Sequence, residues 1–142
     1  MEIDQIYTEL IKEHSLYSDN KKPLENATVS ELGVNPSCGD EIVLNIKLNN
    51  DIIEDASFEG VGCAISQASA SMMIDIIKGK TISQAKDNVT IFLKMIKNED
   101  VNNNDLDRLE DAVVLKGISK LPARVKCAVL AWRTLDKILS DK

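Results

Sequence analysis

The side chains best suited to chemistry in this chain are its three cysteines, at positions 38, 63 and 127. Cys38 lies in the stretch NPSCGD, two residues before Asp40, among residues that favour turns. A cysteine with only a packing role usually lies inside a periodic apolar segment, whereas turn residues are generally reachable by solvent. Cys38 is therefore the cysteine that we expect to be most accessible.

Three thiolates and one carboxylate make a reasonable tetrahedral donor set for zinc. A glycine separates Cys38 from Asp40, and its conformational freedom would let both side chains converge. Such a site would be negatively charged, so a nearby cation is expected, with Arg124, one helical turn before Cys127, as first candidate and Lys126 as second. The spacing alone matches no short zinc motif, so three independent thiols remain an alternative.

The periodicity of the apolar residues predicts the elements that position these side chains. The 3.6-residue pattern predicts helices over 2–15, 64–77 and 82–97 and a last helix from Pro122. Alternation predicts a strand over 41–48, and a hairpin turn at 49–51 returns the chain as a second strand over 52–59. A weaker strand is expected over 28–32. Residues 98–112 are acidic and rich in asparagine, which indicates a loop with a helical turn.

This order of elements predicts an α+β fold, in which helices cover one face of a small antiparallel sheet. All three cysteines would lie at the ends of elements, so a common edge of the sheet would gather them. Cys63 and Cys127 would lie near helix N-termini, where free N–H groups and the helix dipole favour a thiolate. His14, the only histidine, is expected to be a surface residue rather than a ligand.

Composition limits the class of protein. The 142 residues suit one domain, 1–142, and carry a net charge of −6. Residues 1–112 carry 10 Lys and Arg against 21 Asp and Glu, and residues 113–142 carry 7 against 2. An acidic body argues against nucleic-acid binding. No apolar run is long enough to cross a membrane, and the N-terminus resembles no signal peptide. The odd cysteine count argues against a closed disulfide framework, so we expect a cytoplasmic protein with reduced thiols.

Several motifs occur together in a recognisable order. They are NPSCGD, FEGVGCAISQASASMM, GKTISQA and LKGISKLPARVKCAVLAW, spread over residues 35–135. In this order they resemble the IscU-like (NifU N-terminal-like) family of iron–sulfur cluster assembly proteins, and within it the SufU branch. Lys126 stands where IscU proteins have a histidine, and the acidic segment at about 98–116 resembles the insertion of the SufU branch.

The resemblance implies a function and a set of site residues. It implies a zinc-dependent sulfurtransferase that takes persulfide sulfur from a SufS-type cysteine desulfurase, stimulates that enzyme, and serves a SufB-containing scaffold complex downstream. Zinc would be held by Cys38, Asp40, Cys63 and Cys127. Cys38 would accept the sulfur once the desulfurase displaces it from the metal, and Arg124 would engage Asp40.

Two alternatives stay open at this point. Three cysteines and an aspartate could also hold an iron–sulfur cluster, so the chain could be a cluster assembly scaffold that uses the same ligands. A four-ligand zinc site could also be purely structural, in which case the protein would regulate the desulfurase by binding alone.

Overall fold

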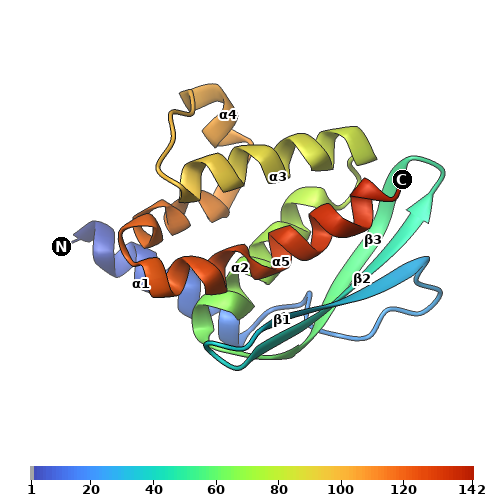
Figure 1. Cartoon of the computed structure of the whole chain (residues 1–142), viewed down its shortest axis with the longest axis horizontal. Helices are drawn as coiled ribbons and strands as arrows, with labels where there is room; N and C mark the ends of the chain where they lie inside the picture. The colour runs from blue at the N-terminus through green and yellow to red at the C-terminus, as the bar shows by residue number, and fades with distance from the viewer. Residues whose placement is uncertain (1) are drawn as a thin grey trace.

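A computed structural model describes residues 2–142 (Figure 1). The helices are α1 (Glu2–Leu16), α2 (Ala64–Ile77), α3 (Ile82–Ile96), α4 (Asn103–Asp107), the 3₁₀ helix η1 (Glu110–Lys120) and α5 (Pro122–Ser140). The strands are β1 (Val29–Asn35), β2 (Asp40–Asn49) and β3 (Ile52–Val61). The predicted helices and the two strands of the hairpin, β2 and β3, are confirmed to within one or two residues at most ends.

The three strands form one antiparallel sheet in the order β1-β2-β3. The β2–β3 hairpin turns at Asn50, which adopts a positive φ of 57°, a conformation that asparagine tolerates better than most residues. Alternate residues of β2 (Ile42, Leu44 and Ile46) are fully buried on the inner face. The weak strand prediction at 28–32 corresponds to β1, which continues to Asn35 and pairs that residue with Asp40.

The helices lie on one side of the sheet, as the α+β prediction requires (Figure 1). Helix α2 packs against β3, and α5 packs against β1 and β2. Where β1 meets α5, a Cβ on Gly33 would lie 2.1 Å from Thr134 Oγ1, so only glycine permits this approach. Helix and sheet therefore come close enough to bring the start of α5 next to the β1–β2 turn.

An aromatic pair and a hydrogen-bond chain join α5 to its helical neighbours. The rings of Phe92 and Trp132 stack with their centroids 4.2 Å apart. Trp132 Nε1 donates to Ser69 Oγ (3.0 Å), whose hydroxyl donates to the carbonyl of Ala128 (2.6 Å). The buried indole therefore has the polar partner that a tryptophan in a core needs.

Helix α1 is connected to the rest of the fold through His14. Its Nδ1 lies 2.9 Å from Ser71 Oγ on α2, and its Nε2 lies 3.2 Å from Asp111 Oδ2 on η1. The His14 side chain is only 14% exposed. The prediction of a surface histidine was therefore wrong in part, because the packing of α1 on α2 covers this residue, which the sequence of α1 alone could not reveal.

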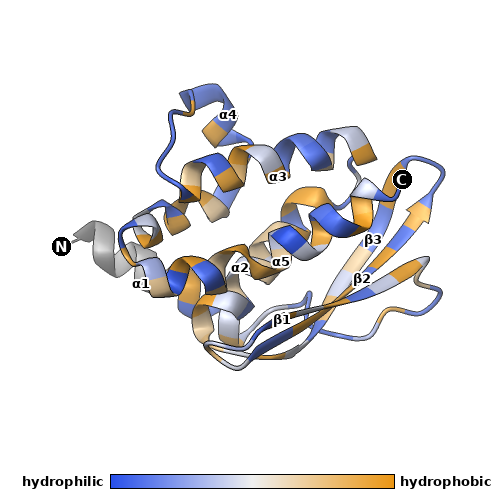
Figure 2. Cartoon of the chain, viewed as in Figure 1, coloured by the Kyte–Doolittle hydropathy of each residue, from blue (hydrophilic) through white to orange (hydrophobic). Residues whose placement is uncertain are grey.

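The segment after α3 contains the helical turn predicted within residues 98–112, and a further helix follows it. Residues 103–107 form α4, which Asn102 caps by accepting a hydrogen bond from the Asp105 amide, and residues 110–120 form η1. The α4 region is hydrophilic (Figure 2), whereas η1 buries Ala112, Leu115 and Ile118. This short apolar series packs η1 against α3 and α5 and explains why the segment folds. No helix in the described part of the chain is long and apolar enough to cross a membrane.

Candidate metal centre

The turn between β1 and β2 positions the first of the predicted ligands. Asn35 ends β1, Asp40 begins β2, and the Cys38 amide donates to the Asn35 carbonyl across the turn (3.3 Å). Gly39 has a φ of +70°, a left-handed conformation that glycine adopts without strain. Cys38 is exposed, as its place among turn residues predicted.

Asp40 lies at the centre of the site. Its side chain is fully buried. Oδ1 accepts hydrogen bonds from the Cys63 amide (2.9 Å) and the Ser66 hydroxyl (3.2 Å), and Oδ2 accepts one from Asn35 Nδ2 (3.2 Å). Three donors from two elements therefore hold the carboxylate in one orientation, beside the start of α2.

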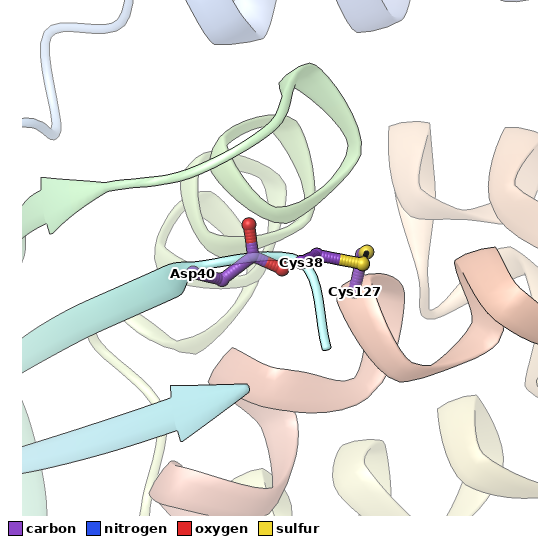
Figure 3. Close-up of side chains that lie close together, drawn as sticks. All are labelled: Cys38, Asp40 and Cys127. Carbon is purple, nitrogen blue, oxygen red and sulfur yellow. Dashed lines mark hydrogen bonds between the residues drawn. The ribbon is translucent and has the colours of Figure 1, made fainter. Parts of the chain in front are cut away.

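Cys127 approaches the same point from α5. Its side chain is fully buried, and its Sγ lies 3.2 Å from Cys38 Sγ and 3.8 Å from Asn35 Nδ2. One donor atom from each of Cys38, Asp40 and Cys127 lies within 4.8 Å of the others. Figure 3 shows these three side chains converging from the β1–β2 turn and the start of α5. The sequence predicted this convergence at one edge of the sheet.

Cys63 stands next to this group without belonging to its closest part. It is the N-cap residue of α2, half-buried, and its side chain makes no capping hydrogen bond. Its amide donates a hydrogen bond to Asp40 Oδ1 (2.9 Å). Cys63 is therefore tied to the site through its backbone amide, and the predicted ligand role of its thiol stays a prediction.

The donor set is compatible with zinc. Tetrahedral zinc with Zn–S bonds of about 2.3 Å separates two thiolate ligands by roughly 3.8 Å, and Cys38 and Cys127 lie 3.2 Å apart at Sγ. An outward shift of the exposed Cys38 side chain would supply the difference. Cys38, Asp40 and Cys127 could therefore hold the ion, and Cys63 as the fourth ligand stays a prediction.

The protonation of Cys127 differs from the prediction. We expected the helix N-terminus to favour its thiolate, but burial raises the pKa of this thiol well above its ordinary value, and hydrogen bonding with Cys38 raises it further. Removal from water disfavours the charged form more than the helix dipole favours it. Cys127 therefore needs a nearby cation, such as a bound metal ion, to ionise.

The structure places the predicted cations outside the group. Arg124 and Lys126 are exposed in the first turns of α5. Among the residues described, the hydrogen-bond partners of the Asp40 carboxylate are Asn35, Cys63 and Ser66, as given above. The engagement of Arg124 with Asp40 stays a prediction.

Sequence reasoning missed three residues that shape the site. Asn35 donates to Asp40 and contacts Cys127, and Ser66 donates to Asp40. Gly62 leaves space for the carboxylate, because a Cβ there would lie 2.5 Å from Asp40 Oδ1. These residues stand close in the sequence to predicted ligands, in NPSCGD and in GCAIS, but they are common residue types that carry no signature of a supporting role.

Comparison with known proteins decides the family. Residues 6–137 match the NifU-like N-terminal domain family. The chain belongs to this family. The zinc-dependent sulfurtransferase SufU of Bacillus subtilis (strain 168) is 45% identical over 135 residues, which cover 95% of this chain and 90% of the relative. The iron–sulfur cluster assembly scaffold protein IscU of Thermotoga maritima is 40% identical over 139 residues, which cover 98% of this chain and 96% of the relative.

A solved structure agrees with this placement in the NifU-like family. The crystal structure of a candidate iron–sulfur cluster assembly scaffold protein for the SUF system, from Fervidobacterium islandicum, superposes with a TM-score of 0.87 at 38% identity. The match covers 95% of this chain and 97% of that one. The fold is therefore the IscU/SufU-type α+β fold, and the family function is iron–sulfur cluster assembly.

Proposed function

We propose that this protein is a zinc-dependent sulfur carrier that accepts persulfide sulfur from a SufS-type cysteine desulfurase on Cys38. The observation that carries the proposal is the contrast in burial within the site. Cys38 is exposed, whereas Asp40 and Cys127 are fully buried. A scaffold for a stable centre needs no exposed ligand, whereas a carrier needs one sulfur that a partner's thiol group can reach. The B. subtilis relative, named a zinc-dependent sulfurtransferase, supports this choice.

The residues divide into holding and reacting groups. Asp40, Cys63 and Cys127 are the proposed permanent zinc ligands, and Cys38 is the proposed exchangeable one. Bound zinc would keep the thiol groups deprotonated at neutral pH and protect them from oxidation. Arg124 is exposed near Cys127, and we propose that it turns toward Asp40 when the partner docks and Cys38 is released.

The transfer step itself is a thiol–disulfide exchange. The Cys38 thiolate attacks the outer sulfur of the desulfurase persulfide, and a new S–S bond forms at Cys38 Sγ. The S–S bond of the desulfurase breaks, and its cysteine leaves with the electron pair as a thiolate. The sulfane sulfur keeps its oxidation state and its proton, so no external oxidant or reductant is needed. A SufB-containing scaffold complex is the proposed downstream acceptor.

A cluster assembly scaffold is the second candidate function. The T. maritima relative carries that name at 40% identity, and the same residues could ligate an iron–sulfur cluster. The residue before Cys127 is Lys126, so the histidine that IscU-like scaffolds use as a ligand is missing. This absence of a ligand at one position makes the carrier the better-supported function.

The test measures alanine formation from cysteine by a SufS-type desulfurase, with ³⁵S-cysteine as sulfur source. We expect the zinc-loaded protein to stimulate turnover and to carry label at Cys38, and the metal-stripped protein to stimulate weakly. Cys38→Ser should abolish labelling, and Ser37→Ala, an exposed change in the same turn, should leave it intact. Retention of labile iron and sulfide on the chain without stimulation would instead establish the scaffold. Persistent labelling of Cys38→Ser would rule out Cys38 as the acceptor.

A further inference from the structure

Two of the three thiol groups lie almost in contact, although all three cysteines are free. The thiol of Cys127 donates a hydrogen bond to Cys38 Sγ, and the two sulfur atoms are 3.2 Å apart. A disulfide bond is about 2.05 Å long, so these atoms need to approach by only about 1.2 Å to be joined. The fold therefore brings together two thiols that can form a disulfide, one from the β1–β2 turn and one from α5.

The surroundings of Cys38 permit this approach. Residues 36–39 of the β1–β2 turn are all exposed to solvent. A Cβ on Gly39 would meet no atom within 4 Å, so the turn has open space around it. Exposed turns move more easily than the elements that they connect, and Cys127 is fixed within the helix α5. We therefore expect the turn to move toward the helix when the two sulfur atoms join.

Asn35 aligns the two cysteines. Its carbonyl accepts a hydrogen bond from the Cys38 amide (3.3 Å), and its Nδ2 donates to Cys127 Sγ (3.8 Å). The third cysteine is placed differently. Among the described residues, the donor atoms that lie within 4.8 Å of one another belong to Cys38, Asp40 and Cys127, and Cys63 is not in this group. The geometry therefore selects Cys127, and not Cys63, as the partner of Cys38.

The two thiols also differ in the way that a redox sensor requires. Such a sensor has a thiol that solvent can reach, next to a second thiol that resolves the oxidised form into a disulfide. Cys38 is exposed, and Cys127 is fully buried. An oxidant in solution therefore meets Cys38 first, and Cys127 reacts only with the product that forms on Cys38.

We propose that Cys38 and Cys127 form a reversible disulfide when the protein without zinc meets hydrogen peroxide. Cys38 Sγ attacks one peroxide oxygen, the O–O bond breaks, and a sulfenic acid forms while the other oxygen leaves with the thiol proton as water. Cys127 Sγ then attacks Cys38 Sγ, the S–O bond breaks, and the departing hydroxide takes the Cys127 proton as a second water. The two thiols lose two electrons, which the peroxide accepts.

This disulfide switches off the metal centre. The thiolate is the form of cysteine that binds a metal, so the oxidised protein lacks two of its four proposed zinc ligands. Cys38 can then accept no sulfur, a consequence that rests on the proposed function, whereas the disulfide itself does not. A dithiol reductant reverses the change by thiol–disulfide exchange. Zinc bound to Cys38 slows the first step, because it occupies the sulfur that peroxide attacks.

The test treats the full-length protein, zinc-loaded and metal-free, with hydrogen peroxide and maps the products by mass spectrometry. The three cysteines lie in three different tryptic peptides, so each possible pairing has its own mass. We expect the metal-free protein to fall from three free thiols to one, to link the peptides of Cys38 and Cys127, and to regain zinc binding only after reduction with dithiothreitol. The zinc-loaded protein should react more slowly. A Cys38–Cys63 link, or sulfinic acid on Cys38 beside an unreacted Cys127, would overturn the proposal.

Two variants identify the resolving thiol. Cys63→Ser should still form the link between Cys38 and Cys127, and its absence there would contradict the assignment even if other variants fold poorly. Cys127→Ser, a change of similar size, should stop at a sulfenic acid on Cys38 that dimedone traps. Sulfur transfer is measured separately with ³⁵S-cysteine. A mapped Cys38–Cys127 disulfide in a protein that takes no label at Cys38 would overturn the proposed function and leave the redox pair established.

Discussion

The substitution Gly62→Ala tests how tightly the proposed metal centre is built. A Cβ at this position would lie 2.5 Å from Asp40 Oδ1 and 2.5 Å from Ser66 Oγ. Ordinary contact begins at 3.4 Å, so the carboxylate oxygen would have to retreat by about 0.9 Å. Gly62 is not among the glycines with a positive φ. The effect of the substitution therefore comes from the steric collision and not from backbone strain.

The expected loss follows from this displacement. A retreat of about 0.9 Å would lengthen the hydrogen bond from the Cys63 amide to Oδ1 from 2.9 Å to about 3.8 Å, beyond bonding range. One hydrogen bond to a charged acceptor contributes about 1.5–3 kcal/mol. We therefore expect the free energy of unfolding of the metal-free protein to fall by about 2–3 kcal/mol, which lowers Tm by roughly 5–10 °C in a chain of this size. Zinc affinity should fall by about 10-fold to 100-fold, as when other groups that orient metal ligands are changed.

The assay combines two measurements on the same protein. Urea denaturation of the metal-free form gives the free energy of unfolding, and competition with a chromophoric chelator gives the zinc affinity. Gly79→Ala is the control, because Gly79 has a φ of +80° with open space around it and follows α2 at the end remote from Cys63. It should cost about 1–2 kcal/mol through its backbone conformation and leave zinc affinity unchanged. Unaltered zinc affinity in Gly62→Ala would refute the role of Asp40 as a constrained ligand.

Three further outcomes are expected. Iodoacetamide should modify Cys38 of the metal-free protein first and Cys127 last, because Cys38 is exposed and Cys127 is buried. Mass spectrometry of tryptic peptides gives the order of modification, and early modification of Cys127 would contradict the packing of α5. His14→Ala should lower the free energy of unfolding by about 1–2 kcal/mol, because it removes two hydrogen bonds. It should also speed amide hydrogen exchange in α1. Exchange as slow as in the parent protein would mean that His14 does not hold this helix in place. Trp132→Phe should lower the free energy of unfolding, measured by urea denaturation, by about 1–2 kcal/mol because Ser69 Oγ loses its donor. An unchanged urea midpoint would argue that this hydrogen bond contributes nothing to stability.

Most secondary structure could be predicted because its signals are local. The apolar period of 3.6 residues in α2 and α3, and the alternation in β2, depend only on residues close in the sequence. The segment after α3 was harder. Its composition is that of a loop, and η1 forms because three apolar side chains (Ala112, Leu115 and Ile118) find the surfaces of α3 and α5. The burial of these side chains depends on contacts with distant helices, so it cannot be predicted from the local sequence of η1.

The convergence of Cys38, Asp40 and Cys127 was predictable, whereas the residues that support it were not. Cysteine and aspartate are recognisable as ligands by type, and their places at element ends predicted that Cys38, Asp40 and Cys127 would converge. The residues that hold Asp40 in place, Asn35 and Ser66, are common polar types with no signature of their own. Their importance arises only from contact with the carboxylate.

The sequence by itself determined which residues can react, where most helices and strands lie, and which family the motifs resemble, because these depend on residue type and local order. The tertiary structure alone decided that Cys127 is fully buried and Cys63 half-buried, because burial depends on what packs above each residue. It also overruled the local expectation for Cys127, whose pKa is raised by burial although it lies near a helix N-terminus. A helix end favours a thiolate only where water or a cation remains close enough to solvate the charge, and that distance is set by the folded chain.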